Sequence, residues 1–410
     1  MAEVNVKPVL RFPEFKADEF TKHKFDNLFN FSTGKNIKQS EASPEFETPC
    51  VRYGELYHMY NEVIYEVINR TNLDSNDLLF SDGDEILLPS AGEDPLDIGS
   101  ASALTLPDIA IGRTINILKP KADSVYSQIF VSYYINQKLK RKISSLAKGV
   151  SISNVYNSDL KKLRATLPSL PEQKKIATFL TAVDERIQLL QKKKSKLADY
   201  KKGVMQQLFS QQIRFKDEDG YDFPDWEEKR LGDVFKIVVG GTPSTTKKEY
   251  WDGLIGWIGS GELKNNHIKE PTKYITELGL KKSSTHLMPK NTVCLAMTGA
   301  TLGKIGILDF ECAGNQSVAG FLPNPANNQL FLFYKLQSET NQILSYAGGA
   351  AQAGINKNNI EGLKIDFPSL KEQNRIASFL TVIDEYVKNL YREIESVNTF
   401  KKGLLQKMFV

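Results

Sequence analysis

The chain has 410 residues, of which 41% are hydrophobic and 25% charged, and its formal net charge is +4. These are the values of an ordinary globular protein with room for two or three domains. No leader pattern follows Met1 and no apolar run could span a bilayer, so we expect a cytoplasmic protein. Cys50, Cys294 and Cys312 form no CxxC pair and the histidines are scattered, so we expect no disulfide framework, metal site or bound cofactor.

Residues 1–166 are predicted to form a globular module. Short β-rich segments punctuated by Gly and Pro come first, and an apolar helix from Gln128 and a glycine loop follow. The first 150 residues carry 17 basic and 21 acidic side chains, so any DNA contact there must come from local loops. VRYGELYHMYN, from Val51, groups Arg52 with aromatic residues. Arginine is the commonest reader of guanine, but such a cluster is as often part of a core.

Residues 167–212 are predicted to form a long helix. Pro168 precedes it, Ser169 is a candidate cap, and Glu172 follows at the position of a capping box. From Glu172 to Phe209 the apolar residues recur at alternating steps of four and three, which is the pattern of a coiled coil. A helix of about 38 residues would be roughly 57 Å long. This segment carries nine basic and four acidic residues.

Residues 213–366 are predicted to form a second module. Its segment KIVVGGTPSTTKKEYWDG, from Lys236, reads as a strand that enters a hydroxyl-rich turn. Gly240 and Gly241 permit a close backbone approach. The hydroxyls and lysines of the turn suit phosphate contacts, or form a plain polar surface. Tyr250 and Trp257 either stack on a ligand or pack in the core.

A glycine-rich segment of the second module resembles a phosphate loop only superficially. MTGATLGKIGI, from Met297, is one residue short of GxxxxGK, and Ile305 stands where Ser or Thr is required. We therefore predict a turn between strands rather than a nucleotide site, with Lys304 free to meet a DNA phosphate.

Residues 367–410 repeat the first long helix. PSLKEQNRIASFLTVIDEYVKNLYREIESVNTFKKGLLQKMF at 368–409 aligns without a gap to PSLPEQKKIATFLTAVDERIQLLQKKKSKLADYKKGVMQQLF at 168–209. The preceding modules also correspond: GDEILLPSAG from Gly83 aligns with KNTVCLAMTG from Lys290, and QIFVSYYI from Gln128 aligns with QLFLFYKL from Gln329. A period of 200 residues is too long for a solenoid and indicates two copies of a whole module.

The two helices are expected to pair with each other. This gives an α+β fold in which two similar α/β modules are joined by two long antiparallel coiled-coil helices, with a pseudo-twofold internal repeat. Two lysines, Lys201 and Lys401, also lie on the seam, with Gly203 and Gly403 two residues later. Either the seam opens there into solvent, or the glycines let the backbones approach closely while the lysines set the register. The predicted apolar seam consists of Ile176, Leu180, Val183, Ile187, Leu190, Leu197 and Val204 in the first helix and Ile376, Leu380, Ile383, Val387, Leu390, Ile394, Val397 and Leu404 in the second.

Several motifs carry a resemblance to a known family. FPSLKEQNRIASFL and LPSLPEQKKIATFL resemble the conserved regions of type I restriction-modification specificity subunits, and GGTPSTTKKEYWDG, TGATLGKIGI, GNQSVAGF and GINKNNIEGLKI resemble their target-recognition domains. The similarity covers nearly the whole chain in the family's order. The first module departs most, because Gly112, Arg113 and Thr114 stand where the second has Gly314, Asn315 and Gln316.

The resemblance implies a non-catalytic subunit that binds double-stranded DNA. Each target-recognition domain would read one half of a bipartite site, and the helices would set the spacer and dock two methyltransferase subunits. Those partners would carry S-adenosylmethionine and methylate adenine, and endonuclease or translocase subunits would join them. The candidate DNA-binding residues are Lys35, Lys38, Arg52, Tyr53, Arg113, Lys148, Thr242, Ser244, Thr245, Lys247, Lys248, Tyr250, Trp257, Lys264, Thr298, Lys304, Asn315 and Gln316.

Two alternatives compete with this reading. A coiled-coil adaptor that binds only proteins is disfavoured by two modules whose loops have diverged on one scaffold. A stand-alone enzyme is disfavoured because the sequence contains no NPPY or DPPY motif, no FxGxG loop, no Walker A motif, no helicase box and no GxSxG elbow.

Overall fold

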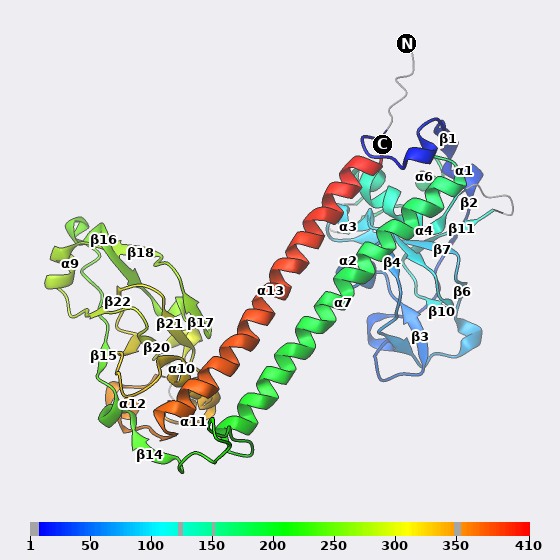
Figure 1. The fold of residues 1–410 in the computed structure, drawn as a ribbon. Coiled ribbons are helices and arrows are strands. Elements are labelled where there is room, and N and C mark those ends of the chain that lie inside the picture. Colours follow the sequence, from blue (N-terminus) through cyan, green and yellow to red (C-terminus); the bar gives the residue numbers. More distant parts are fainter. Residues whose placement is uncertain (1–7, 122–125, 150–151, 348–353) are drawn as a thin grey trace. The chain divides into compact units, whose positions relative to one another are not determined.

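The computed structural model describes residues 8–121, 126–149, 152–347 and 354–410 (Figure 1). The chain divides into two compact units, Met1–Gln191 with Arg392–Val410, and Lys192–Tyr391. Each unit therefore holds one globular domain and half of each long helix. Among the described residues no helix is long and apolar enough to cross a membrane.

The first unit is built on a five-stranded and a four-stranded sheet. Two strand pairs, β1 (Thr21–Lys24) with β13 (Arg164–Leu167) and β8 (Ala91–Gly92) with β12 (Ser153–Asn154), complete the unit. The larger sheet has the order β2 (Phe29–Thr33), β11 (Ile115–Pro120), β7 (Glu85–Pro89), β9 (Ser102–Leu104) and β4 (Val63–Ile64). The smaller has the order β5 (Arg70–Thr71), β3 (Thr48–Val51), β10 (Pro107–Ile111) and β6 (Phe80–Asp82).

The second unit repeats this strand order. Its larger sheet is β15 (Ile237–Val239), β23 (Val318–Phe321), β20 (Val293–Ala296), β21 (Ile305–Leu308) and β17 (Asn266–Ile268). Its smaller sheet is β18 (Lys273–Ile275), β16 (Trp251–Ile258), β22 (Cys312–Gly314) and β19 (Leu287–Met288), and β14 (Glu227–Arg230) pairs with β24 (Lys364–Phe367). Both larger sheets end in a parallel pair, β4 with β9 and β17 with β21. The predicted repetition of one scaffold is confirmed.

Short helices connect the strands of both units. The first unit has α1 (Phe25–Leu28), α2 (Glu55–His58), α3 (Pro95–Ile98), α4 (Gln128–Tyr134), α5 (Lys140–Ser144) and α6 (Asn157–Leu160). The second has α8 (Leu231–Val234), α9 (Glu277–Lys281), α10 (Gln329–Ser338), α11 (Thr340–Ser345) and α12 (Lys357–Gly362). The predicted apolar helices from Gln128 and Gln329 are α4 and α10.

The two long helices are α7 (Leu170–Phe209) and α13 (Leu370–Met408), close to the predicted bounds. Inside each unit their halves run antiparallel: Asp184 meets Lys401 in the first unit, and Asp384 meets Lys201 in the second. Most predicted seam residues are buried, whereas Leu197, Val387 and Val397 are partly buried.

The seam packs on the domains as well as on the other helix. In the first unit one apolar cluster joins Ile176, Leu180 and Val183 of α7 to Tyr133 of α4 and Met408 of α13. The cluster of the second unit joins Ile376 and Leu380 of α13 to Tyr334 of α10 and Leu208 of α7 in the same way. Each domain is therefore fixed to the ends of both helices by a shared core, which a coiled coil alone does not provide.

No other backbone comes close to Gly203 or Gly403, the glycines that follow the seam lysines. A Cβ placed on Gly203 or Gly403 would meet no atom within 4 Å. The predicted close approach is therefore wrong, because the backbones are not in contact at these positions. Lys201 and Lys401, two residues earlier, do pair across the helices with Asp384 and Asp184, as the same prediction expected of the lysines.

A polar cluster repeats where each domain meets the helices. The hydroxyls of Tyr133 and Tyr334 donate to Asp184 and Asp384, and these aspartates pair with Lys401 and Lys201. Burial lowers the pKa of Lys401, but the carboxylates of Glu62 and Asp184 outweigh it, so that its pKa is raised. Burial raises the pKa of Asp184 against the effect of Lys401.

The start of each long helix is tied down by an arginine. Arg11 makes a bidentate contact with Glu172, with both distances 2.7 Å. Arg214 makes the same contact with Glu372 at 3.1 and 2.8 Å. Neither arginine was predicted from the sequence. The only signal was the shared Arg-Phe dipeptide at 11–12 and 214–215, whose phenylalanines pack on Phe179 and Phe379 of the helices.

Candidate nucleic-acid interface

Three loops of the second domain meet at one place. The loop after β15 carries Thr242, whose hydroxyl donates to Gln316 in the loop between β22 and β23. The loop after β20 carries Thr298, whose hydroxyl donates to Ser317 at 2.6 Å. The structure thus brings together Thr242, Thr298, Asn315 and Gln316, which are four of the predicted DNA-binding residues. Their surface offers hydroxyl and amide groups, the chemistry that reads base edges and binds phosphates.

Glycines make the close meeting of these loops possible. A Cβ on Gly240 would lie 2.1 Å from the carbonyl oxygen of Gly314, and one on Gly241 would lie 2.3 Å from the hydroxyl of Ser284. The predicted close approach at these two glycines is confirmed. The first domain repeats it, because a Cβ on Gly34 would lie 1.9 Å from the carbonyl oxygen of Gly112. The loops of both domains are thus clamped at equivalent points.

Two aromatic candidates belong to the core and not to the loop surface. Tyr250 and Trp257 are each only 7% exposed, so neither ring offers a free face for stacking on a base. The indole of Trp257 donates to the carbonyl oxygen of Gly241 at 3.0 Å. We therefore correct the assignment of both residues as DNA-binding. They pack beneath the turn and hold it in place.

The lysine candidates of the second domain are exposed. Lys247, Lys248, Lys264 and Lys304 all reach solvent, as do the hydroxyls of Ser244 and Thr245. The hydrogen bond from Lys247 to the Tyr250 hydroxyl, 3.2 Å long, raises the pKa of Lys247. Contact of these side chains with DNA remains a prediction.

The first domain gathers four of its candidates in one groove of about 460 Å³. Lys38, Arg52, Tyr53 and Arg113 all line it. Arg52 is not free, because its guanidinium donates to Glu55 at 2.7 Å and is only partly exposed. The groove therefore combines two exposed cations with an arginine that is already oriented by a carboxylate. This arrangement suits an anionic or base-edge ligand.

Two further candidates of the first domain lie outside this groove. Lys35 is exposed and its ammonium contacts the carbonyl oxygen of Asn76 at 3.3 Å. Lys148 pairs with Asp159 at 3.1 Å, and Lys162 shares that carboxylate. These pairs with Lys148 and Lys162 lower the pKa of Asp159. Lys148 is thus, like Arg52, a candidate of this domain whose charge a carboxylate already matches.

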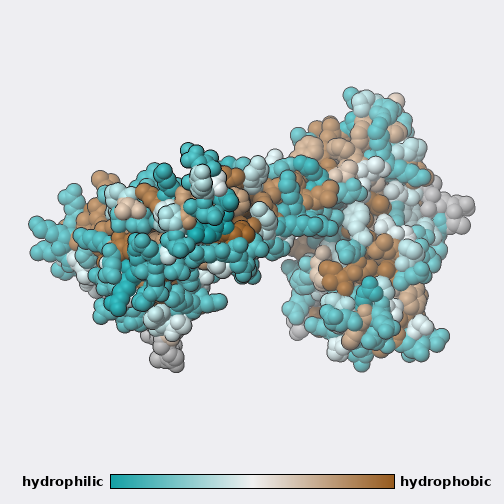
Figure 2. All heavy atoms as spheres, turned by 60° about the horizontal axis from the view of Figure 1, so that its bottom comes forward, coloured by the Kyte–Doolittle hydropathy of each residue, from teal (hydrophilic) through white to brown (hydrophobic). Residues whose placement is uncertain are grey.

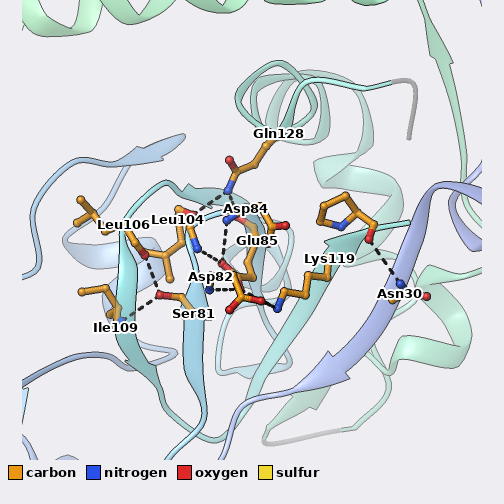
Figure 3. A network of polar contacts seen from close by, with 12 residues as sticks. Asn30, Ser81, Asp82, Asp84, Glu85, Leu104, Leu106, Ile109, Lys119 and Gln128 are labelled. Atoms are coloured by element: carbon orange, nitrogen blue, oxygen red, sulfur yellow. Dashed lines mark hydrogen bonds and ion pairs between the residues drawn. The ribbon is translucent and has the colours of Figure 1, made fainter. Parts of the chain in front are cut away.

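An acidic network occupies the turn between β6 and β7, as Figure 3 shows. Oxygens of Asp82, Asp84 and Glu85 lie within 4.8 Å of one another. Glu85 is buried and accepts the turn amides of Asp82, Gly83 and Asp84 at 2.7, 3.0 and 3.1 Å. Lys119 pairs with Asp82 and, at 3.5 Å, with Glu85. The Glu85 carboxylate therefore holds the turn, and Lys119 offsets the charge of Glu85 and Asp82. The expected absence of a metal stays a prediction.

The exposed surface offers no single dominant apolar area on the face shown in Figure 2. Hydrophilic residues predominate there, and apolar residues are exposed in separate patches. Scattered exposed apolar side chains are normal for proteins in water. The loops and the groove therefore remain the places where specific recognition is best supported.

Comparison with known proteins shows which family the chain resembles. Residues 17–199 and 224–398 both match the family described as type I restriction modification DNA specificity domain. The MjaX specificity subunit of Methanocaldococcus jannaschii is 29% identical over 304 residues, which are 72% of this chain and 70% of that protein. The EcoR124I/EcoR124II specificity subunit of Escherichia coli is 30% identical over 179 residues, 41% of this chain and 44% of that one.

Solved structures agree on the fold. The S subunit of a type I restriction-modification system from Mycoplasma genitalium superposes with a TM-score of 0.64 at 19% identity, with 99% of both chains covered. The HsdS subunit of Thermoanaerobacter tengcongensis superposes with a TM-score of 0.50 at 16% identity, with 98% of both covered. With two specificity domains matched over most of its length, the chain belongs to the family of type I restriction-modification specificity subunits.

Proposed function

We propose that this subunit selects the DNA sequence on which a type I restriction-modification complex acts. Each domain reads one half of a bipartite target, through the loops around Gln316 in the second domain and the groove around Arg52 in the first. The observation that carries the proposal is that two domains share one strand order while their loops differ in residues and in charge. One scaffold with two different loop sets is what two different half-sites require.

The chain itself carries out no chemistry in this proposal. Methylation of adenine belongs to two partner methyltransferase subunits that bring S-adenosylmethionine, and cleavage belongs to endonuclease and translocase subunits. The complex works in the cytoplasm, where the chromosome is its substrate. The long helices supply the dock for the partners and keep the two domains at a fixed separation, so that half-sites are read at a fixed helical phase.

The decisive experiment is to express the chain with its cognate methyltransferase subunit and to map adenine methylation across a genome. A motif of two short half-sites separated by a non-specific spacer is expected. Methylation without a bipartite motif would contradict the proposal. A gel shift of labelled duplex tests the adaptor alternative: sequence-independent binding, or none, in the presence of the methyltransferase subunit would support the adaptor.

The helices are also expected to act as a ruler. Four residues inserted near Lys194 add about one helical turn, roughly 6 Å, and nearly keep the phase of the seam. Both half-sites should survive, and the spacer should lengthen by about one or two base pairs at 3.4 Å each along a strand. Two inserted residues should instead rotate the seam off its partner and destabilise the protein. An active four-residue variant with an unchanged spacer would contradict the ruler.

A further inference from the structure

The two seam lysines have different surroundings at equivalent places. Lys401 pairs with Asp184 at 2.7 Å and with Glu62 at 2.9 Å. Lys201 pairs with Asp384, and no second carboxylate reaches it among the described residues. Both ammonium groups also lie over a tyrosine ring of the neighbouring helix, at 5.4 and 4.9 Å. The difference is therefore one missing acid beside Lys201.

The strand register shows which residue replaces that acid. Glu62 directly precedes β4, where Val63 pairs with Ala103. In the second unit His267 of β17 occupies the place of Val63, because it pairs with Ile307 just as Val63 pairs with Ala103. Ala103 and Ile307 in turn pair with Ile86 and Val293, and these two residues align with each other in the sequence repeat. The counterpart of Glu62 is therefore Asn266, which is neutral and exposed.

A groove is open beside Lys201 in the second unit. It has a volume of about 860 Å³, and its lining includes Lys201, Lys202 and Gln206 of α7, Gln337 of α10 and Asn265, which directly precedes β17. The first-unit cavity of about 220 Å³ that Asn61 and Lys401 line is a different space, because its other walls come from α7 around Ile187 and from the segment around β4. In the first unit Glu62 lies beside the lysine, whereas no second carboxylate reaches Lys201 among the described residues.

The open groove presents hydrogen-bond donors that lack acceptors. Lys202 is exposed, and within the described ranges it forms no ion pair. The side-chain nitrogen of Gln337 is buried and has no hydrogen-bond partner among the described residues. The one carboxylate on the lining, that of Glu339, is already paired with Lys335 at 2.7 Å. A buried amide donor without a partner is unfavourable, so an occupant with acceptor oxygens is favoured.

We propose that an acidic segment of a partner protein docks in this groove and supplies the carboxylate that Glu62 supplies in the first unit. The partner is the methyltransferase subunit, and in this respect the inference rests on the proposed function. A carboxylate is favoured over a DNA phosphate because the chain itself places a glutamate at the equivalent site. The two units then engage the partner differently: the second takes an acid from it, and the first already holds Glu62 beside its lysine.

The repeat provides a matched pair of variants to test this. Lys202→Glu reverses a charge on the groove, and Lys402→Glu reverses the equivalent exposed charge in the first unit. With the full chain and purified methyltransferase subunit, Lys202→Glu should weaken one binding step at least about tenfold at low salt. Lys402→Glu should leave both steps within about twofold, and Lys202→Gln should give an intermediate loss. The thermal midpoint of each variant checks that folding is unchanged.

Three results would overturn the inference. Equal effects of Lys202→Glu and Lys402→Glu would show that the two units do not bind the partner differently. Unchanged binding in Lys202→Glu would show that the groove is not a docking site. Unchanged subunit assembly together with weaker binding of a DNA duplex would assign the groove to phosphate instead. If the unaltered chain bound no methyltransferase subunit, the proposed function itself would fail, and the occupant of the groove with it. That outcome can be told apart from the other three, because it is measured on the unaltered chain and not on a variant.

Discussion

The two domains are tied to the helices by the same residues but to different depths. In the first unit the Arg11 side chain is 5% exposed and that of Asp184 is 12% exposed. Their counterparts Arg214 and Asp384 are 21% and 39% exposed. The repeat therefore preserves the ion pairs that orient each domain, while the surrounding residues decide how far water is excluded. Removing one partner of the pair should consequently cost more stability in the first unit than in the second.

The largest difference is expected at the starts of the two helices. Arg11→Met leaves the fully buried carboxylate of Glu172 without its cation, which should lower the free energy of unfolding by about 3–5 kcal/mol. Arg214→Met should cost less, because the indole of Trp226 still donates to Glu372 at 3.2 Å. Thermal or urea unfolding of the two variants measures the difference. Equal losses would show that neither the Trp226 hydrogen bond nor the deeper burial of Arg11 separates the two junctions.

A smaller difference is expected at the seam lysines. Lys401→Met leaves Asp184 and Glu62 facing each other with little access to water, so we expect a loss of roughly 3 kcal/mol. Lys201→Met leaves only Asp384, which water can solvate, so about 1 kcal/mol is expected. Adding Glu62→Gln to Lys401→Met should restore part of the stability. If the double variant were no more stable than Lys401→Met, repulsion between the carboxylates would not be the cause.

The comparison also shows which parts of the structure could be predicted from the sequence. The ungapped repeat and the seam predicted both long helices and the duplicated scaffold, because apolar periodicity reflects burial directly. The prediction failed at Gly203 and Gly403, because a missing Cβ permits a close approach without requiring one. Tyr250 and Trp257 were assigned to the surface because the sequence does not show which side of a turn an aromatic ring faces.

Other features depend on contacts between distant residues. Arg11 and Glu172 are 161 positions apart, and an Arg-Phe dipeptide is too short a signal to predict such a contact. The pairing of Thr242 with Gln316 spans 74 positions. Both contacts exist only once the sheets have formed. The sequence therefore pointed to these loops of the second domain without showing that they meet.

The smallest expected effects concern the exposed lysines of the recognition loops. If Lys247, Lys248 and Lys304 each contact a phosphate, alanine at any of them should weaken binding to all duplexes and reduce the salt slope by about one. Lys229, which pairs with Glu227 on β14, provides the control. Arg52→Ala in the first domain should instead weaken binding to the target duplex more than to other duplexes, because an oriented arginine suits base reading. Unchanged affinity at every salt concentration would show that the three lysines are surface residues that do not contact DNA.

The central claim is that the two domains read DNA independently, and exchanging one of them tests it most directly. Residues 1–165 would be replaced by the first domain of another family member, and adenine methylation would be mapped across the genome. We predict that one half-site changes while the other half-site and the spacer stay as they were. A simultaneous change of both half-sites would contradict the claim.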